Sequence, residues 1–216
     1  MALVDVNQSK CIEVRLTRIE NVLSELEAVW RVKRHLLKRR VSSAVLKVAP
    51  RDCYYHWTLQ ERAAFLDCNI EHLCKSIIVE NTAYAKKSIN HAYGGRYLCI
   101  IVQYQEKLDA EQLSRFVCAL VAKETGIAVA RKYFSFQHAP KDVCAERTGF
   151  EHNGVSPFGS KQFFPVIASE EILKTRSGYV WLGGGAPNFK LKVATSQLVR
   201  ALDAQVAPNI TRLRIN

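Results

Sequence analysis

The sequence lacks the long apolar runs and paired cysteines that would indicate a membrane protein or a zinc protein. No stretch near 18 residues is continuously apolar, whereas a membrane-spanning helix needs about 20 such residues. The first ten residues contain no apolar core of the signal-peptide type. The seven cysteines are odd in number and form no C-x-x-C pair. We therefore expect a soluble cytoplasmic protein in a reducing compartment, without metal or cofactor.

Familiar nucleophile and metal motifs are absent as well. The chain has no G-x-S-x-G elbow, no H-E-x-x-H, no P-loop with its lysine, and no H-x-E with a matching P-C-x-x-C. No internal repeat or low-complexity tract is visible. Any catalysis must therefore depend on positioning and on backbone donors rather than on a motif of this kind.

What the sequence does contain is positive charge and enough apolar residues for a core. Its 216 residues are 48% hydrophobic, which suffices for one well-packed domain plus an appendage. The 31 lysines and arginines outnumber the 20 aspartates and glutamates by 11. This excess favours a polyanionic partner such as nucleic acid or an acidic membrane surface. Charge alone does not choose between the two.

The N-terminal segment is predicted to be a helix with one narrow apolar stripe. Its apolar positions alternate spacings of four and three residues. The stripe consists of Ile12, Leu16, Ile19, Leu23, Leu26 and Trp30. Three interpretations stay open: packing on the chain's own domain, pairing with a second copy to form a homo-oligomer, or docking on another protein.

A basic segment follows the stripe between residues 31 and 40. It holds six basic residues and no acidic one, namely Arg31, Lys33, Arg34, Lys38, Arg39 and Arg40. These residues could be a solvated helix end that complements the helix dipole, or an arm that binds phosphates. Residues 41–52 are predicted to be a connector. We accordingly divide the chain into residues 1–50, the helix and connector, and residues 51–216, the main domain.

The main domain mixes strands and helices without regular alternation. Strands are expected at residues 76–80, 97–104, 163–167, 179–182 and 189–194, and helices at 59–66, at 109–125, from 169 and from 196. Thr58 and Glu61 form a capping-box pattern, and Gly126 is placed to end the longest of these helices. The pattern predicts an α+β fold.

Two glycine-rich loops are candidates for one binding site. The first is Gly-Phe-Glu-His-Asn-Gly-Val-Ser-Pro-Phe-Gly at 149–159, and the second is Gly-Gly-Gly-Ala-Pro at 183–187. Glycine and Asn153 tolerate positive φ and Pro157 stiffens the exit, so backbone N–H groups can approach a ligand closely. Such loops can hold an anion or a developing oxyanion.

Few side chains near these loops could carry chemistry. Lys75 begins an apolar strand and could bind a phosphate or a carbonyl, or its ammonium could simply reach solvent. His152 and Glu151 lie within the first loop, where the histidine could be a general base or could fix the loop by a hydrogen bond. Cys74 could act as a thiolate only with a histidine partner, which the sequence does not identify.

Five segments together carry a family resemblance. They are Leu-Cys-Lys-Ser-Ile-Ile-Val at 73–79, the loop at 149–159, Pro-Val-Ile at 165–167, Trp-Leu-Gly-Gly-Gly at 181–185 and Lys-Leu-Lys-Val-Ala-Thr-Ser-Gln-Leu at 190–198. In this order they resemble the YbaK family, the editing domains associated with prolyl-tRNA synthetase. The resemblance spans about residues 53–204 and leaves the N-terminal helix outside.

The resemblance implies a compact α+β domain with a mixed, barrel-like sheet that hydrolyses the ester between a wrong amino acid and tRNA. It implies that Lys75 contacts the 3′ end of the substrate, and that the backbone of a G-x-x-x-P loop holds the ester. The resulting catalytic set is Lys75, Gly154, Val155 and Ser156, and the substrate-binding set is His152, Asn153, Pro157, Gly183, Gly184 and Gly185. The family's substrates assist their own hydrolysis through a ribose hydroxyl or side chain.

Two positions depart from the family pattern. Asn153 stands where the loop motif begins with glycine, and Ala168-Ser169 offers no aspartate where many relatives have one. The first hypothesis is therefore a trans-editing deacylase, with tRNA for proline carrying a small amino acid as its substrate. The second is a non-catalytic tRNA-binding adaptor that joins an aminoacyl-tRNA synthetase or multi-synthetase complex through residues 10–40. Both hypotheses assign tRNA as the partner and no membrane.

Overall fold

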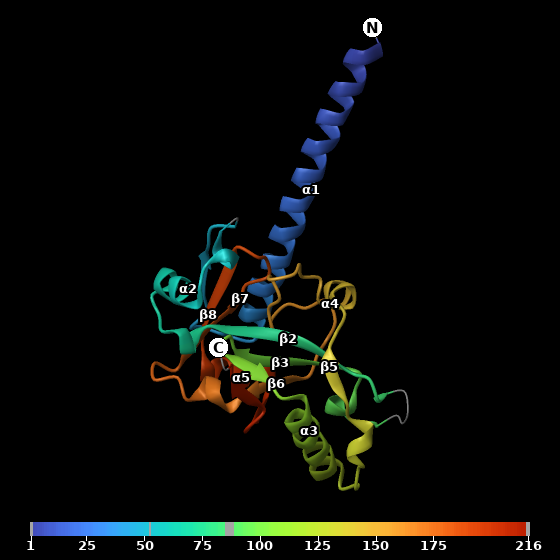
Figure 1. Ribbon diagram of the computed structural model, residues 1–216, viewed down its shortest axis with the longest axis vertical. Coiled ribbons are helices and arrows are strands. Elements are labelled where there is room, and N and C mark those ends of the chain that lie inside the picture. The colour runs from blue at the N-terminus through green and yellow to red at the C-terminus, as the bar shows by residue number, and fades with distance from the viewer. Residues whose placement is uncertain (1, 52, 85–88, 215–216) are drawn as a thin grey trace.

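A five-stranded mixed sheet forms the centre of the domain (Figure 1). The computed structural model describes residues 2–51, 53–84 and 89–214, with side chains from residue 10 onward. In spatial order the strands are β5 (Phe136–His138), β2 (Cys74–Asn81), β3 (Tyr97–Gln103), β6 (Val166–Ser169) and β9 (Gln205–Ala207). β2 is antiparallel to β3 and β5, whereas β6 is parallel to β3 and β9. The predicted mixed sheet is confirmed.

A second, antiparallel sheet contains β1 (Val45–Val48), β8 (Phe189–Ala194) and β7 (Tyr179–Gly183), in that order. A separate ribbon pairs β4 (Glu106–Leu108) with β10 (Thr211–Leu213). Among the described residues, one bridge between Leu73 and Trp181 joins the edges of the two larger sheets. The expected barrel-like closure is therefore wrong, because no continuous ladder of hydrogen bonds runs from β2 to β7.

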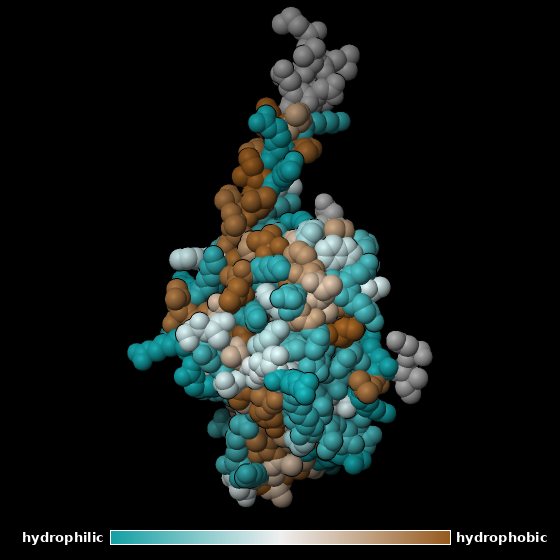
Figure 2. Space-filling model, turned by 90° about the vertical axis from the view of Figure 1, so that its left-hand side faces the viewer, coloured by the Kyte–Doolittle hydropathy of each residue, from teal (hydrophilic) through white to brown (hydrophobic). Residues whose placement is uncertain are grey.

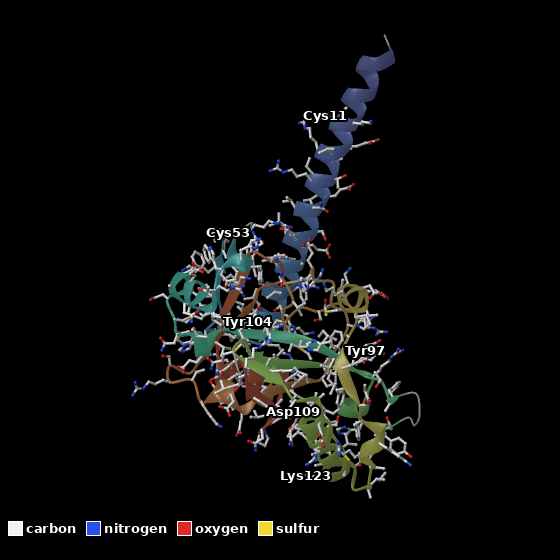
Figure 3. The ribbon with its side chains drawn as sticks, in the orientation of Figure 1. Cys11, Cys53, Tyr97, Tyr104, Asp109 and Lys123 are labelled. Atoms are coloured by element: carbon white, nitrogen blue, oxygen red, sulfur yellow. The ribbon has the colours of Figure 1, made fainter. Side chains whose placement is uncertain are left out.

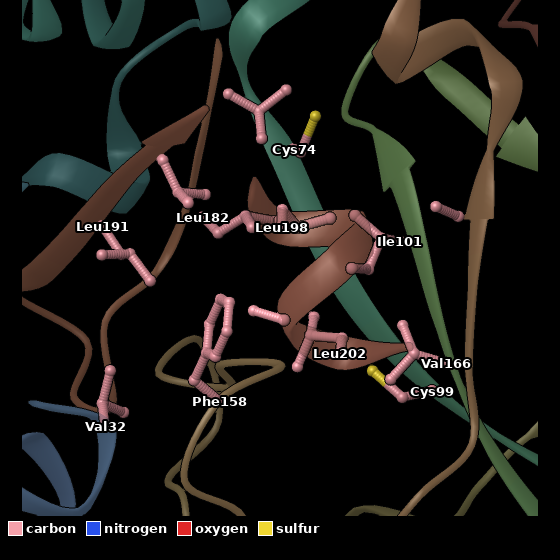
Figure 4. Close-up of a cluster of buried hydrophobic side chains, with 14 of the residues drawn as sticks. Val32, Cys74, Cys99, Ile101, Phe158, Val166, Leu182, Leu191, Leu198 and Leu202 are labelled. Atoms are coloured by element: carbon pink, nitrogen blue, oxygen red, sulfur yellow. The ribbon is translucent and has the colours of Figure 1, made fainter. Parts of the chain in front are cut away.

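Two apolar clusters cover the two faces of the central sheet. Side chains of a strand alternate between faces, so Ile101 packs in one cluster and Ile100 in the other. The first cluster includes Leu191, Leu198 and Val32 from the second sheet and two helices (Figure 4). Because both faces are buried, β2 and β3 read in the sequence as nearly continuous apolar runs.

Four helices surround the sheets, and their ends follow from local sequence. They are α2 (Leu59–Leu66), α3 (Ala110–Thr125), α4 (Lys141–Thr148) and α5 (Thr195–Leu202). The capping box of Thr58 and Glu61 is confirmed at the start of α2. Asp109 caps α3, which ends at Gly126 with a left-handed φ of 69°. α3 packs Leu113 and other apolar side chains on the central sheet.

The N-terminal helix, α1 (Ala2–Lys38), packs on the domain only through its C-terminal part. Ala28, Val32 and Leu36 belong to the first apolar cluster. The rest of α1 projects away from the domain, and Cys11 lies far out on it (Figures 1 and 3). All six stripe residues are more than half exposed, so the stripe does not pack on its own domain.

Residues 41–52, expected to be a connector, instead include β1. Val45–Val48 pairs with β8 as an edge strand, and its half-exposed side chains left no clear alternation in the sequence. The boundary at residue 50 stays a prediction, since residues on both sides of it contribute to one core.

Candidate functional site

A cavity of about 370 Å³ lies where the edges of the two sheets meet. β2 contributes Cys74 to Ile78, and β7 contributes Trp181 to Gly183. The remaining walls include the 3₁₀ helix η1 (Tyr54–His56), α4, Tyr104, the first glycine-rich loop and residues of β5 and β8. Of the predicted site residues, the cavity brings together Lys75, His152, Asn153, Val155 and Gly183. No aspartate or glutamate of the described chain lines it.

The loop at 149–159 is held against α1 at both ends. Arg31 donates hydrogen bonds to the carbonyl oxygens of Gly149 and, at 3.2 Å, Gly159. The amide of Gly159 donates to Nδ1 of His35 over 2.8 Å, and the His35 ring packs edge-on against Phe158. Only 13% of the Arg31 side chain is exposed, so we omit it from the proposed tRNA contacts.

Within this loop the backbone turns sharply at Asn153. Its φ is 68°, in the left-handed region that asparagine tolerates better than most residues. The Gly154 amide donates to the Glu151 carbonyl over 2.9 Å, and the Gly154 carbonyl accepts from the Gly185 amide over 3.1 Å. The amides of Val155 and Ser156 make no hydrogen bond with other described residues. Val155 lines the cavity, so its amide is available as a donor to a ligand.

Ser156 and Pro157 are buried and do not line the cavity. The Ser156 hydroxyl accepts a hydrogen bond from the Phe158 amide over 3.2 Å. Both side chains therefore support the loop from behind.

The second glycine-rich run lets β7 come into contact with the loop. A Cβ atom at Gly183 would lie 2.2 Å from the carbonyl oxygen of Val155, a separation that real atoms do not adopt. Gly184 and Gly185 lie behind the cavity, where Cβ atoms would meet Leu46, Phe189 and Ala28. Gly183 thus lines the site, while its two neighbours permit close packing.

Lys75 enters the cavity from β2, as predicted. Its Nζ lies 5.5 Å from the centre of the Tyr104 ring. Burial, and secondarily the charge of Arg214, lowers the pKa of Lys75 to about 8. The group remains mostly protonated at neutral pH and can attract a phosphate or a carbonyl oxygen.

A second lysine, which the site prediction missed, lies on the other side of the cavity. Lys190 of β8 is 4% exposed, and its Nζ donates to the Tyr55 hydroxyl at 2.6 Å and to the Pro187 carbonyl at 2.8 Å. The Tyr55 hydroxyl in turn donates to the carbonyl of Asn153. Burial, followed by the charge of Arg62, lowers the pKa of Lys190 to about 7.

The other titratable groups near the cavity offer no activated nucleophile. Burial raises the pKa of the Cys74 thiol far above neutral, so Cys74 is not a thiolate nucleophile. His138 lines the cavity, and burial together with Lys75 lowers its pKa. Glu151 is exposed and faces Arg51 at 3.7 Å. His152 is exposed at the mouth of the cavity.

The basic segment does not act as one unit. Lys33, Arg34 and Lys38 are exposed on α1. Arg39 forms an ion pair of 3.1 Å with Asp203, and the Arg40 carbonyl accepts a hydrogen bond from Arg200. We propose Lys33, Arg34 and Lys38 as a phosphate-binding surface, with Arg39 and Arg40, which are also exposed, at its margin.

The described part of the chain contains neither a metal-binding cluster nor a helix able to cross a membrane. No group of three or more His, Cys, Asp or Glu side chains there has the arrangement of a metal site. None of the helices described combines the length and apolar character that crossing a membrane requires.

Solved structures share this fold. A candidate trans-editing enzyme for prolyl-tRNA synthetase aligns with a TM-score of 0.63 and 20% identity over 88% of this chain and 98% of that one. A scaffold protein from work on computational epitope grafting aligns with a TM-score of 0.61 and 20% identity, over 88% and 97% of the two chains. A hypothetical protein aligns with a TM-score of 0.61 and 19% identity, over 84% and 99%. No family model and no curated protein matches. The α+β fold with a mixed sheet that the sequence resemblance implied is confirmed, without the barrel-like closure.

Proposed function

We propose that this chain is a trans-editing aminoacyl-tRNA deacylase. One observation carries the proposal: Lys75, Val155 of the first glycine-rich loop and Gly183 converge on one cavity. The fold, shared with a candidate trans-editing enzyme for prolyl-tRNA synthetase, supports this reading. By the same argument, the first substrate to test is tRNA for proline carrying a small amino acid, and the proposed location is the cytoplasm.

The cavity suits an electron-rich ligand. Among the described residues it is lined by Lys75, Lys141 and Lys190 without a carboxylate, so it attracts the phosphate and carbonyl oxygens of an aminoacylated 3′ end. We assign Lys75 to the 3′ end of the tRNA and the Val155 amide to the ester carbonyl. Lys190 has its donors engaged by Tyr55 and Pro187 and serves to position the loop.

The proposed reaction needs no protein nucleophile. Water adds to the ester carbonyl. The negative charge that develops on the carbonyl oxygen is stabilised by N–H donors that are already in place. The bond between the carbonyl carbon and the ribose oxygen then breaks. The amino acid keeps the hydroxyl of water, and the ribose oxygen takes a proton. Such an activated ester requires mainly orientation and oxyanion stabilisation.

The second candidate is a non-catalytic adaptor that binds tRNA within a synthetase assembly. It is favoured by the absence of a carboxylate on the cavity wall among described residues, since the α-ammonium of an aminoacyl group then has no ionic partner there. Ala168 and Ser169 stand where many members of the resembled family have an aspartate. Both lie buried in β6 and outside the cavity.

A deacylation screen separates the two candidates. We expect the protein to remove one of alanine, cysteine, serine or threonine from mischarged tRNA, and Lys75→Ala to reduce the rate by at least about 100-fold. Lys107→Ala is the matched control, because Lys107 is exposed on β4 and outside the cavity. Retained tRNA binding with no deacylation on any substrate would reject the enzyme and leave the adaptor.

A further inference from the structure

Helix α1 presents two apolar faces on opposite sides. Successive residues of an α-helix are rotated by about 100°, which places Ala28, Val32 and Leu36 about half a turn away from the stripe. These residues of the first face pack into the domain. The stripe, from Ile12 to Trp30, is exposed, and Figure 2 shows apolar side chains along one side of the projecting helix. The domain therefore accounts for one face only.

The exposure of the stripe is large and uniform. Its six members are between 52% and 59% exposed, and Val22 beside them is 47% exposed. Together they present on the order of 500 Å² of apolar surface, comparable to the largest patches on monomeric proteins and to one side of a small interface. A helix that projects into water also lacks the tertiary packing that normally stabilises helices. Both facts indicate an interface.

The charges beside the stripe favour parallel pairing of identical helices. In heptad terms Leu16, Leu23 and Trp30 occupy a positions, and Ile12, Ile19 and Leu26 occupy d positions. Every e position carries an acidic residue, namely Glu13, Glu20 and Glu27. An antiparallel pair would place these glutamates against each other. In a parallel pair, Arg15 at a g position faces Glu20 of the next copy, and this contact occurs twice.

The domain does not obstruct such an assembly. Because it packs on the face of α1 opposite the stripe, the domains of neighbouring copies would lie outside the helical bundle. Leucine at a with isoleucine at d favours more than two strands, and the apolar Val22 at a g position widens the contact face. Beyond Trp30, the charged Lys33 and Arg34 mark the end of the stripe.

We propose that the stripe is a self-association surface, through which copies of this chain form a parallel coiled coil of two or more helices, with four favoured. The stripe of one copy therefore packs against the stripe of another copy. A helix of a different protein is the competing occupant.

Light scattering coupled to size-exclusion chromatography tests this directly. The full chain, at up to about 100 μM, should have a mass of two or more times 24.5 kDa. Leu16→Glu with Leu23→Glu should return it to one chain. The matched control, Thr17→Glu with Ser24→Glu, adds the same charges at the same spacing off the stripe, on exposed positions, and should keep the wild-type mass. A monomeric wild-type chain overturns the proposal, whatever other protein it binds.

Charge exchange tests the parallel arrangement. Arg15→Glu alone and Glu20→Arg alone should each weaken self-association about tenfold, because like charges then face each other across the interface. The double exchange should restore it to within about threefold. Circular dichroism checks that all variants keep their helix content. If Glu20→Arg strengthens association, the helices are antiparallel and the proposed assembly is wrong.

Discussion

At the scale of single residues, a chain of hydrogen bonds connects the buried Lys190 to the 149–159 loop. Lys190 donates to the Tyr55 hydroxyl, and Tyr55 donates to the carbonyl of Asn153. Arg62 donates to the backbone carbonyls of Tyr54 and Tyr55 and so fixes the start of this chain. The position of the loop amides therefore depends on residues that need not touch the substrate.

Removing one hydroxyl should test this dependence. Tyr55→Phe deletes the donor to Asn153 and the acceptor of the buried Lys190. We expect kcat to fall roughly tenfold, because a buried donor left unsatisfied costs about 1–3 kcal/mol. Tyr54→Phe removes the same atom from the adjacent residue and should change kcat little. Steady-state deacylation kinetics measure both. Equal rates for the two variants would mean that Tyr55 does not position the loop.

The depressed pKa of Lys190 makes a prediction about stability. Its folded-state pKa of about 7 lies below the ordinary value of 10.5, so the unfolded chain binds more protons between those two values. Stability must then rise with pH in this window. Between pH 7 and 8.5 the free energy of unfolding should rise less steeply in Lys190→Met than in wild type, as measured by urea denaturation. Parallel pH profiles would show that Lys190 titrates normally.

Some of these residues could be predicted from the sequence and others could not. Lys75 is recognisable because it begins an otherwise apolar strand. The loop around Asn153 is recognisable because its glycines, asparagine and proline indicate a turn. Lys190 looks like one of two alternating lysines in a strand, and its role depends on Tyr55, which lies 135 residues away. The sequence predicts Arg31 as a tRNA contact, whereas in the structure it holds the 149–159 loop. This role could not be predicted because its partners Gly149 and Gly159 are 118 and 128 residues distant.

At the scale of elements, the contact between β7 and the 149–159 loop determines the shape of the cavity. Gly183→Ala would place a methyl group 2.2 Å from the Val155 oxygen, so the strand and the loop must separate. We expect a loss of about 2 kcal/mol or more in unfolding free energy and a larger proportional loss of deacylation.

Gly95→Ala is a suitable comparison, because the nearest atom would be 3.2 Å away and φ is −70°. Urea denaturation and single-turnover deacylation report the two effects separately. Wild-type activity in Gly183→Ala would show that the close approach is unnecessary.

Long or strongly patterned elements were predicted correctly, whereas short ones were missed. β2 and β3 read as long apolar runs, α1 has a periodic stripe, and α3 has a periodic apolar face with a cap at each end. The missed strands β1, β4, β5, β9 and β10 are three or four residues long, and they exist because a neighbouring strand supplies their hydrogen bonds. α4 was missed because its largely polar sequence carries no apolar stripe. The second apolar face of α1, formed by Ala28, Val32 and Leu36, is recognised only from their packing on the domain.

At the scale of the whole molecule, the cavity is assembled from parts that are distant in the sequence. β2, β7, η1 and the 149–159 loop meet there, and α1 anchors the loop from the other side. The stripe on α1 faces away from this assembly. Self-association and ester hydrolysis therefore use separate surfaces of one chain, and a stripe variant should retain the activity of each individual site.

The central claim, that the cavity holds an aminoacyl ester, is tested most directly by a crystal structure with a non-hydrolysable aminoacyl-adenosine amide. We predict that the amide carbonyl lies within about 3 Å of the Val155 N–H, with the nucleoside toward Lys75. We also predict that Lys75→Ala weakens binding of this compound. A compound bound outside the cavity, or bound there with its carbonyl turned away from the Val155 amide, would contradict the central claim.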